Sequence, residues 1–599
     1  MATEMPKTDT VPDAAELTPT LGKIAEQSQR LVTDFVARQS DQTDSDADPL
    51  NISDAFLQMT QRMMADPVRL AEAQVELWNG YMTLWHQTAN RMMGQDVEPV
   101  AVPEEEDRRF KDADWDENPV FDYIKQSYLM TSKWMINTVN ETEGMDDETS
   151  RKVDFYTRQF ADAMAPTNFA MTNPEVLRET VESKGQNLIN GLSNLLDDLE
   201  KGDGQLRIKH VEDDAFELGK TVATSPGKVV FQNELFQLLQ FSPLTEKVRK
   251  TPLLIVPPWI NKYYIFDLRE KNSFIKWATE QGNTVFVVSW VNPDARLGTK
   301  TFEDYMLDGP VAALGAACEA SGADKVNIIG YCIGGTMTAT ALAYMADKGD
   351  DRVASATFFT TLVDFEEPGE LGVFIDEQQI TSLEKKMGER GYLEGSEMAS
   401  TFSMLRANDL IWSFVINNYL LGKEPFPFDL LFWNADSTRM PAVMHSYYLR
   451  KIYQDNALVK PGGLELGGVK IDLRKIKIPV YILSTKEDHI APWESTFAAT
   501  QLYSGQTKFV LASSGHIAGV VNPPVSNRYS YRTNVKKAKT PAEWVDGAKE
   551  HAGSWWTDWD KWVGKFAGGE VAARVPGKGK LKAIEDAPGS YVMVRSQEN

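Results

Sequence analysis

The chain has 599 residues, a formal net charge of −24, 42% hydrophobic residues and two cysteines. This length exceeds one ordinary hydrophobic core and predicts two domains, or one large domain with an appendage. The negative charge argues against nucleic-acid binding and against adsorption to anionic lipid, because phosphates would be repelled. Cys318 and Cys332 form neither a metal-type Cys-x-x-Cys spacing nor a disulfide framework, so we expect a reducing cytoplasm and no bound metal.

The N-terminal residues 1–50 are acidic, end in the polar run Asp41 to Asp48, and lack the apolar core of a signal peptide. Such a segment buries too little apolar surface to order itself, so we expect a disordered acidic tail over these residues. No apolar run of the chain approaches the about 20 residues that a membrane-spanning helix needs. We therefore expect a soluble protein without a transmembrane segment.

Residues 51–215 have the pattern of a helical domain. Asp66-Pro67, Asn118-Pro119 and Asn173-Pro174 each combine an N-cap residue with a proline in the first turn, which is typical of a helix start. After the first of these, large side chains recur at spacings that predict one helical face: Trp78, Tyr81, Trp85 and Met92. This face is most simply part of the core. The alternative is adhesion to a hydrophobic body or to a helical partner, and the sequence does not distinguish the two.

From residue 216 onward, short apolar strands alternate with helical segments, which predicts a mostly parallel sheet covered by helices. The predicted strands are 253–256, 284–290, 326–330, 356–362, 480–483 and 508–512. An aromatic-rich insertion, 366–477, separates the fourth strand from the fifth and is too long for a plain crossover. We expect a catalytic α/β domain over 216–599 with this insertion as a cap over its active site.

The third predicted strand ends in Gly330-Tyr331-Cys332-Ile333-Gly334-Gly335, and an Ala-rich helical segment follows. The Gly-x-Cys-x-Gly spacing between a strand and a helix is typical of the nucleophile elbow of the α/β-hydrolase fold, with Cys in place of Ser. The two glycines are expected because the tight turn leaves no room for Cβ atoms. We predict Cys332 as the nucleophile, against the alternative of a buried free cysteine at a Gly-rich corner.

A thiol nucleophile needs a base, because only a few per cent of it is thiolate at neutral pH. Of the six histidines, His516 lies on the loop directly after the last predicted strand, where this fold presents its base. Asp488 follows the preceding strand and gives the expected chain order Cys, Asp, His. Asp364, after the fourth strand, is the competing acid.

The negatively charged oxygen of the reaction intermediate must also be stabilised. One donor is expected to be the backbone amide of Ile333, at a helix N-terminus where amides are unpaired. The second should come from the loop after the first strand. Because Pro257 and Pro258 have no N–H, Trp259 or Ile260 is the first candidate there.

An acyl group on cysteine is a thioester, nearly isoenergetic with an acyl-CoA, whereas an acyl group on serine is a less reactive oxygen ester. A cysteine enzyme can therefore take an acyl group from CoA and keep it activated for attack by an alcohol. This chemistry favours a synthase. The alternatives are a Cys-dependent acyl-CoA thioesterase or esterase, and a coat or scaffold protein whose triad is a relic.

Together, these motifs resemble those of the class I polyhydroxyalkanoate synthases. The resemblance rests on the Cys332 segment, on Pro257-Pro258-Trp259-Ile260-Asn261-Lys262-Tyr263-Tyr264, on Glu487-Asp488-His489-Ile490-Ala491-Pro492-Trp493 and on Gly515-His516-Ile517-Ala518-Gly519. It covers essentially everything after about residue 100. Tyr331 and Ile333 differ conservatively from the most familiar residues of the class.

The resemblance implies an acyltransferase that polymerises (R)-3-hydroxyacyl-CoA, such as 3-hydroxybutyryl-CoA, into a polyester and releases CoA. It places the family's catalytic residues at Cys332, Asp488 and His516, and the protein on polyester granules in the cytoplasm. The expected partners are the granule surface and a second copy of the chain in a homodimer. No cofactor is expected beyond the coenzyme A thioester that serves as substrate.

Coenzyme A carries several phosphate charges, which an acidic protein must meet locally. Residues 517–542 contain no Asp or Glu but five basic residues: Arg528, Arg532, Lys536, Lys537 and Lys539. Arg528 and Arg532 are therefore candidate phosphate ligands. The alternative is a solvated surface patch, since no Gly-rich phosphate loop accompanies the segment.

Overall fold

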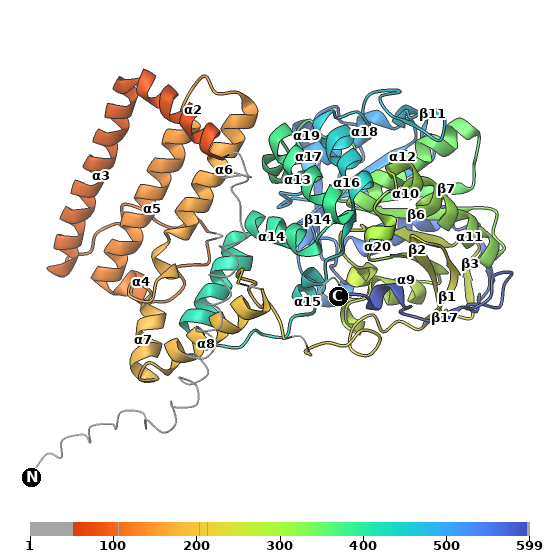
Figure 1. The fold of residues 1–599 in the computed structure, drawn as a ribbon, viewed down its shortest axis with the longest axis horizontal. Helices are drawn as coiled ribbons and strands as arrows, with labels where there is room; N and C mark the ends of the chain where they lie inside the picture. The colour runs from red at the N-terminus through yellow and green to blue at the C-terminus, as the bar shows by residue number, and fades with distance from the viewer. Residues whose placement is uncertain (1–51, 106, 203, 213, 596–599) are drawn as a thin grey trace, which may run out of the picture. The chain divides into compact units, whose positions relative to one another are not determined.

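The computed structural model describes residues 52–105, 107–202, 204–212 and 214–595, and the disordered tail predicted for residues 1–50 lies outside them. The chain divides into two compact units (Figure 1). The first contains the chain up to Glu212 together with Arg406–Phe426, and the second contains Asp213–Leu405 and Pro427–Asn599. Among the helices that the structure describes, none combines the length and the apolar character needed to cross a lipid bilayer.

The first unit is helical. Its helices are α2 (Ile52–Ala65), α3 (Pro67–Met92), α4 (Asp114–Glu117), α5 (Pro119–Asn140), α6 (Asp147–Ala163), α7 (Pro174–Glu182) and α8 (Gln186–Lys201). The three predicted helix starts are confirmed: the side chains of Asp66, Asn118 and Asn173 accept hydrogen bonds from backbone amides at the N-termini of α3, α5 and α7. A proline follows each cap, as predicted.

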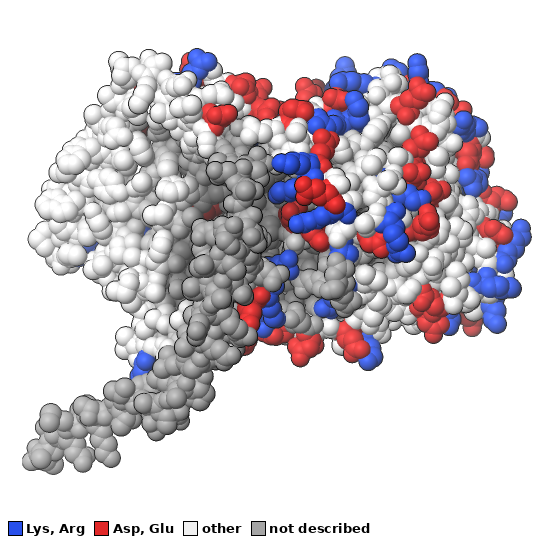
Figure 2. Space-filling model, viewed as in Figure 1, with Lys and Arg blue, Asp and Glu red and all other residues white. Residues whose placement is uncertain are grey.

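Helix α3 has an exposed apolar stripe, which we call the α3 stripe: Val68, Val75, Trp78, Met82, Trp85 and Met92. Trp78 and Trp85 are 67% and 61% exposed. Tyr81, which was predicted on the same face, lies at its edge and is half-buried rather than exposed. It lies about 60° around the helix from Trp78, on the side of α5, where its hydroxyl is 2.7 Å from Thr131 Oγ1. Figure 2 shows few charged side chains over this part of the first unit.

Residues 406–426, which the sequence placed in the cap, pack within the first unit instead. The π-helix η8 (Val415–Leu420) lies against α8, where Asn187 Nδ2 donates to the carbonyl of Leu420 at 2.8 Å. Gly191 allows this close approach, because a Cβ atom there would lie 1.8 Å from the carbonyl oxygen of Tyr419. Tyr419 in turn donates its hydroxyl hydrogen to Asp198 Oδ2 at 2.6 Å.

The second unit contains an eleven-stranded sheet with the order β15-β14-β13-β12-β7-β6-β4-β5-β2-β1-β17. The six central strands are parallel and confirm the six predicted ones: β4 (Leu253–Val256), β5 (Val285–Trp290), β6 (Val326–Tyr331), β7 (Val353–Phe359), β12 (Val480–Thr485) and β13 (Thr507–Ala512). The α/β-hydrolase fold class follows from this arrangement.

Antiparallel strands that the sequence did not reveal extend both edges of the sheet. They are β1 (Gly227–Gln232), β2 (Phe236–Phe241) and β17 (Glu585–Asp586) on one side and β14 (Ser530–Thr533) and β15 (Lys549–Ala552) on the other. Strand β13 is therefore not the last strand of the chain. Neither β14 nor β15 has a buried residue, so neither has the apolar run that predicts a central strand.

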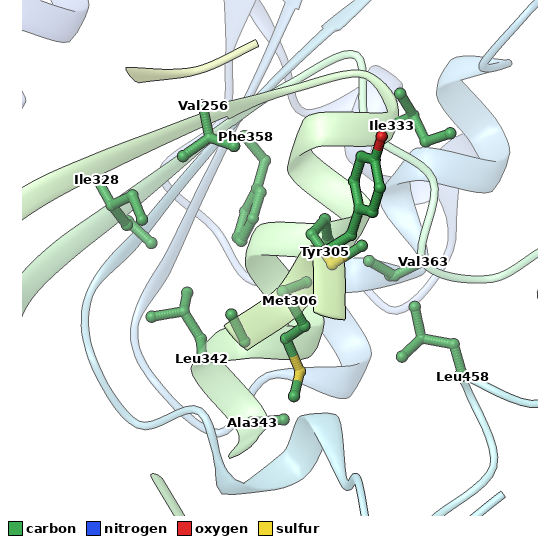
Figure 3. Close-up of a cluster of buried hydrophobic side chains, with 14 of the residues drawn as sticks. Val256, Tyr305, Met306, Ile328, Ile333, Leu342, Ala343, Phe358, Val363 and Leu458 are labelled. Atoms are coloured by element: carbon green, nitrogen blue, oxygen red, sulfur yellow. The ribbon is translucent and has the colours of Figure 1, made fainter. Parts of the chain in front are cut away.

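Helices cover the sheet, among them α9 (Phe274–Glu280), α10 (Phe302–Met306), α11 (Ala312–Ser321), α12 (Ile333–Lys348) and α20 (Trp556–Val563). The insertion that was predicted to form a cap, called the cap below, contributes α13 (Glu377–Arg390), α14 (Gly395–Leu405), α15 (Asp429–Ala435), α16 (Ala442–Tyr447) and the π-helix η9 (Tyr448–Gln454). In Figure 3, side chains of the central strands, such as Ile328 and Phe358, lie beside Leu342 of α12 and Met306 of α10. Because these side chains are almost fully buried, α12 is held firmly against the sheet.

Candidate active site

Cys332 is the single residue between strand β6 and helix α12. Its backbone has φ 52° and ψ −126°, a conformation that residues with a Cβ atom rarely adopt. The amide of Cys332 donates to the carbonyl of Phe359 at 2.9 Å, which fixes the turn to the neighbouring strand β7. This geometry presents the thiol at the carboxyl edge of the parallel strands, as the predicted elbow requires.

The glycines on either side of Cys332 have the steric role expected of them. A Cβ atom at Gly330 would lie 2.5 Å from Gly335 Cα, so the strand and the helix could not approach each other as they do. A Cβ atom at Gly334 would lie 2.5 Å from the carbonyl oxygen of Val256. The start of α12 therefore packs directly against the backbone that leads into the loop after β4.

His516 and Asp488 meet because their strands are parallel neighbours: β13 ends at Ala512, and β12 ends at Thr485. His516 Nδ1 lies 2.7 Å from Asp488 Oδ2, and since the carboxylate is the acceptor, the imidazole donates. Asp488 is itself fixed, because its other oxygen accepts hydrogen bonds from the amides of Ile490 and Ala491 at 3.0 and 2.8 Å. The acid thus holds the imidazole in one orientation.

Asp364, the competing acid, has different partners. Strand β7 ends at Phe359 rather than at Leu362 as predicted, and Asp364 lies on the segment that leads into the cap. Its Oδ1 accepts from Asn456 Nδ2 at 2.7 Å and from the amide of Glu366 at 3.1 Å. Its hydrogen bonds therefore link the chain entering the cap to the chain leaving it.

The electrostatics of the site favour a charged imidazole. Burial lowers the pKa of His516, but the negative charges of Asp488 and Cys332 and the hydrogen bonds to both outweigh it and raise the pKa to about 10. At neutral pH the arrangement therefore favours an imidazolium at His516, between the Asp488 carboxylate and the sulfur of Cys332. Such a pair provides an activated sulfur nucleophile and a nearby proton donor.

Three tyrosines around Cys332 and His516 were missed by the sequence analysis. The ring of Tyr331 stacks on His516 with centroids 5.6 Å apart. Burial raises the pKa of Tyr448 and of Tyr453, and the charge of nearby Cys332 raises both further. Tyr331 stands within the motif, but nothing in the spacing of the two cap tyrosines could have placed them beside the nucleophile.

The expected oxyanion donors lie on two adjoining pieces of backbone. Ile333 is the first residue of α12, so its amide has no partner within the helix. Trp259 and Ile260 are buried, and both of their carbonyl groups accept hydrogen bonds from Thr438, through Thr438 Oγ1 and through its amide at 2.9 Å respectively. Because Thr438 binds the carbonyls of Trp259 and Ile260, the peptide groups that follow these two residues have a fixed orientation.

The structure separates the five basic residues of the segment 517–542. Strand β14 pairs with β13 so that Tyr531 lies opposite Ala512, which places Arg528 at the catalytic edge of the sheet. Arg532 forms an ion pair with Glu550 at 3.2 Å. The three lysines follow Thr533, which pairs with Val510, and so lie toward the opposite edge.

Comparison with known proteins gives matches over nearly the whole chain. Residues 106–278 match the family described as poly-beta-hydroxybutyrate polymerase (PhaC) N-terminus, and residues 270–523 match the alpha/beta hydrolase fold. The chain is similar to the poly(3-hydroxyalkanoate) polymerase subunit PhaC of Rhizobium meliloti, with 48% identity over 98% of this chain and 96% of the relative. It is 50% identical to the poly(3-hydroxyalkanoate) polymerase of Methylorubrum extorquens, over 90% of this chain and 89% of that one. With the PhaC subunit of Cupriavidus necator the identity is 42%, over 88% and 89% of the two chains.

Proposed function

The chain belongs to the family of poly(3-hydroxyalkanoate) polymerases, and on that premise we propose that it polymerises (R)-3-hydroxyacyl-CoA into a polyester through an acyl thioester on Cys332. The enzyme class is that of an acyltransferase, which releases CoA at each addition. The observation that carries the chemical proposal is the hydrogen bond of 2.7 Å between His516 and Asp488 on the loops beside the Cys332 elbow.

Acylation begins with the thiolate of Cys332, whose proton resides on His516. The sulfur attacks the thioester carbonyl of the substrate, the bond to the CoA sulfur breaks, and the imidazolium returns its proton to the departing CoA thiolate. Asp488 keeps the imidazole oriented throughout. The backbone amides of Ile333 and of Trp259 or Ile260 are proposed to hold the negatively charged oxygen of the tetrahedral intermediate.

Chain growth is the attack of a hydroxyl group on a thioester. His516 takes the proton of a 3-hydroxyl, the oxygen attacks the carbonyl of an acyl thioester, and an ester bond forms as the sulfur leaves. A thioester suits this step because its acyl group remains about as reactive as in the substrate. A serine nucleophile would form an oxygen ester instead and lose that activation.

For the phosphates of CoA, we propose Arg528 as the principal contact and Arg532 as a weaker one. Arg528 is exposed at the catalytic edge of the sheet, whereas Arg532 is already paired with Glu550. A charge-assisted contact to a phosphate at Arg528 is consistent with the absence of acidic residues from the segment.

We propose that the first unit attaches the enzyme to the polymer. The α3 stripe presents two tryptophans and several aliphatic side chains to solvent, which suits adhesion to the apolar surface of a polyester granule in the cytoplasm. We also propose a homodimer as the working assembly, which analytical ultracentrifugation at micromolar concentration would test.

One assay distinguishes the polymerase from a Cys-dependent thioesterase. Purified protein is incubated with 3-hydroxybutyryl-CoA while free CoA, soluble 3-hydroxybutyrate and insoluble polymer are measured. The proposal expects CoA release to be matched by polymer. CoA release matched by soluble hydroxy acid would instead identify a thioesterase. No release of CoA at all would favour the scaffold-protein alternative.

A further inference from the structure

The loop that carries Trp259 and Ile260, residues 257–262, is held from two sides; we call it the oxyanion loop. On one side, Trp433 Nε1 donates to the carbonyl of Lys262 at 2.7 Å, and Thr438 binds the carbonyls of Trp259 and Ile260. These contacts come from the cap. On the other side, the loop contacts the C-terminal residues Val592 and Val594 through Lys262.

Lys262 makes the second connection. Its side chain is 1% exposed, and its ammonium group donates to the carbonyl oxygens of Val592 and Val594, both at 2.7 Å. Asp436 Oδ1 lies 3.5 Å from the same ammonium, while Tyr264 donates to the other oxygen of Asp436 at 2.9 Å. Burying an ammonium group is unfavourable unless hydrogen-bond acceptors surround it. The carbonyls of the C-terminal segment therefore stabilise the buried charge of Lys262.

The C-terminal segment 591–594 is anchored independently of Lys262. The amide of Tyr591 donates to Gln237 Oε1 at 3.1 Å, and its hydroxyl donates to the carbonyl of Asn233 at 2.8 Å. Val592 is fully buried. These contacts tie the segment to strand β2 and its preceding turn, so the segment is a fixed support for Lys262.

We propose that the segment 591–594 positions the oxyanion loop through Lys262, which makes Lys262 a positioning residue for the polymerisation reaction. Oxyanion donors must lie about 2.7–3.1 Å from the developing charge, so a small displacement of the loop weakens them. If the two carbonyls were lost, the ammonium would have to move toward other acceptors or water, and the loop two residues upstream would move with it. The inference rests on the proposed roles of Trp259 or Ile260 in oxyanion binding.

Two variants remove the same contacts from opposite ends: Lys262→Met, and a chain ending at Ser590. We expect each to lower CoA release from 3-hydroxybutyryl-CoA by about tenfold to a hundredfold, mainly in kcat, since a misplacement near 1 Å can cost about 10². Alkylation of Cys332 by iodoacetamide forms no oxyanion, so its rate and pH profile should be unchanged in both. The matched control is Lys228→Met, because Lys228 pairs with Asp586 of the same C-terminal region but is 41% exposed.

The combined variant gives the sharper test. If Lys262 and the segment act as one unit, the double variant should be no slower than the more damaged single variant. Unchanged CoA release in Lys262→Met or in the shortened chain would overturn the inference, as would a parallel loss of alkylation, which would show that the whole site is disordered. The inference would also be overturned if the rate losses of the two single variants multiplied in the double variant. A Cys332→Ala protein that still released CoA would refute the proposed function itself, and so is distinguishable from these outcomes.

Discussion

Cys332 and Cys318 provide a matched pair for testing the nucleophile. Cys332→Ala should abolish CoA release while leaving folding intact, because the thiol lies at a turn between strand and helix and is only partly buried. Cys318 is half-buried on α11, and burial raises the pKa of its thiol. Cys318→Ala should therefore retain nearly full CoA release, measured by thiol titration. Equal losses in the two variants would contradict the assignment.

The two candidate acids give a graded prediction. Asp488→Asn should slow turnover by up to about 10⁴, because the amide would no longer orient and charge-stabilise His516 as the carboxylate does. Asp364→Asn should be mild, since an asparagine oxygen can still accept from Asn456 and from the amide of Glu366. Steady-state CoA release with matched protein concentrations tests both. A larger loss in Asp364→Asn would reverse the choice of acid.

The raised pKa of His516 has a consequence for stability. Because the folded-state pKa of about 10 exceeds the ordinary value of 6.5, the imidazolium stabilises the fold fully below about pH 6.5, and this contribution is lost as the pH rises toward 10. The Tm of the wild-type protein minus that of His516→Gln should therefore be largest near pH 6 and shrink toward pH 10. A difference that grows with pH would show that the imidazole is held neutral.

How far single residues can be inferred from the sequence depends on how local their signal is. Cys332 lies in a six-residue motif, and Asp488 and His516 each follow a recognisable strand, so their proximity could be inferred from strand order alone. Lys262 is different. Its partners Val592 and Val594 are more than 300 residues away in the chain, and the contact depends on backbone carbonyls, which carry no residue-type signature.

At the scale of elements, the six central strands were predictable because each is a buried apolar run between turn signals. The edge strands were not, since β14 and β15 are polar and have no buried residue; β14 pairs with the free edge of β13, and β15 pairs in turn with β14. The face of α3 was predicted only in part. Helical spacing groups Trp78, Tyr81 and Trp85, but the packing of α5 decides which of them is covered.

The docking of η8 on α8 gives a prediction at this scale. Asp198 is buried, burial raises the pKa of its carboxyl group, and it accepts from Tyr419 and from the amide of Lys209. Tyr419→Phe should weaken this packing by about 1–3 kcal/mol, because one acceptor site of a buried carboxyl group loses its donor. Hydrogen exchange of the amides in 408–420 should speed up, while exchange in β6 stays unchanged. Unaltered exchange in 408–420 would mean that the tyrosine bond does not hold the segment.

For the whole molecule, the division into units differs from a simple order of domains along the chain. The chain leaves the second unit after Leu405, contributes Arg406–Phe426 to the first unit and returns to the second unit at Pro427. A single boundary near residue 215 was the simplest interpretation of the sequence, because the change from helical to strand-rich pattern occurs there. The excursion could not be predicted, since an aromatic-rich helical segment in a cap has the same composition as one that packs on α8.

The proposed division of labour between the units leads to a prediction for the intact enzyme. None of the proposed catalytic residues lies before Gly227, so removing residues 1–50 should leave turnover nearly unchanged, whereas removing residues 1–199 deletes α8 and exposes the segment that packs on it. The larger deletion would therefore affect both attachment to the polymer and the stability of the protein, and could not separate the two.

The double substitution Trp78→Gln and Trp85→Gln avoids this problem, because both side chains are already exposed in the first unit. It should lower the fraction of enzyme that sediments with polyester granules several-fold while CoA release from soluble substrate stays within about twofold. Glu76→Gln is the matched control, because Glu76 is also exposed on α3 but lies on the side of the helix opposite Trp78 and Trp85. Equal sedimentation of the double variant and the control would show that the α3 stripe does not bind the polymer.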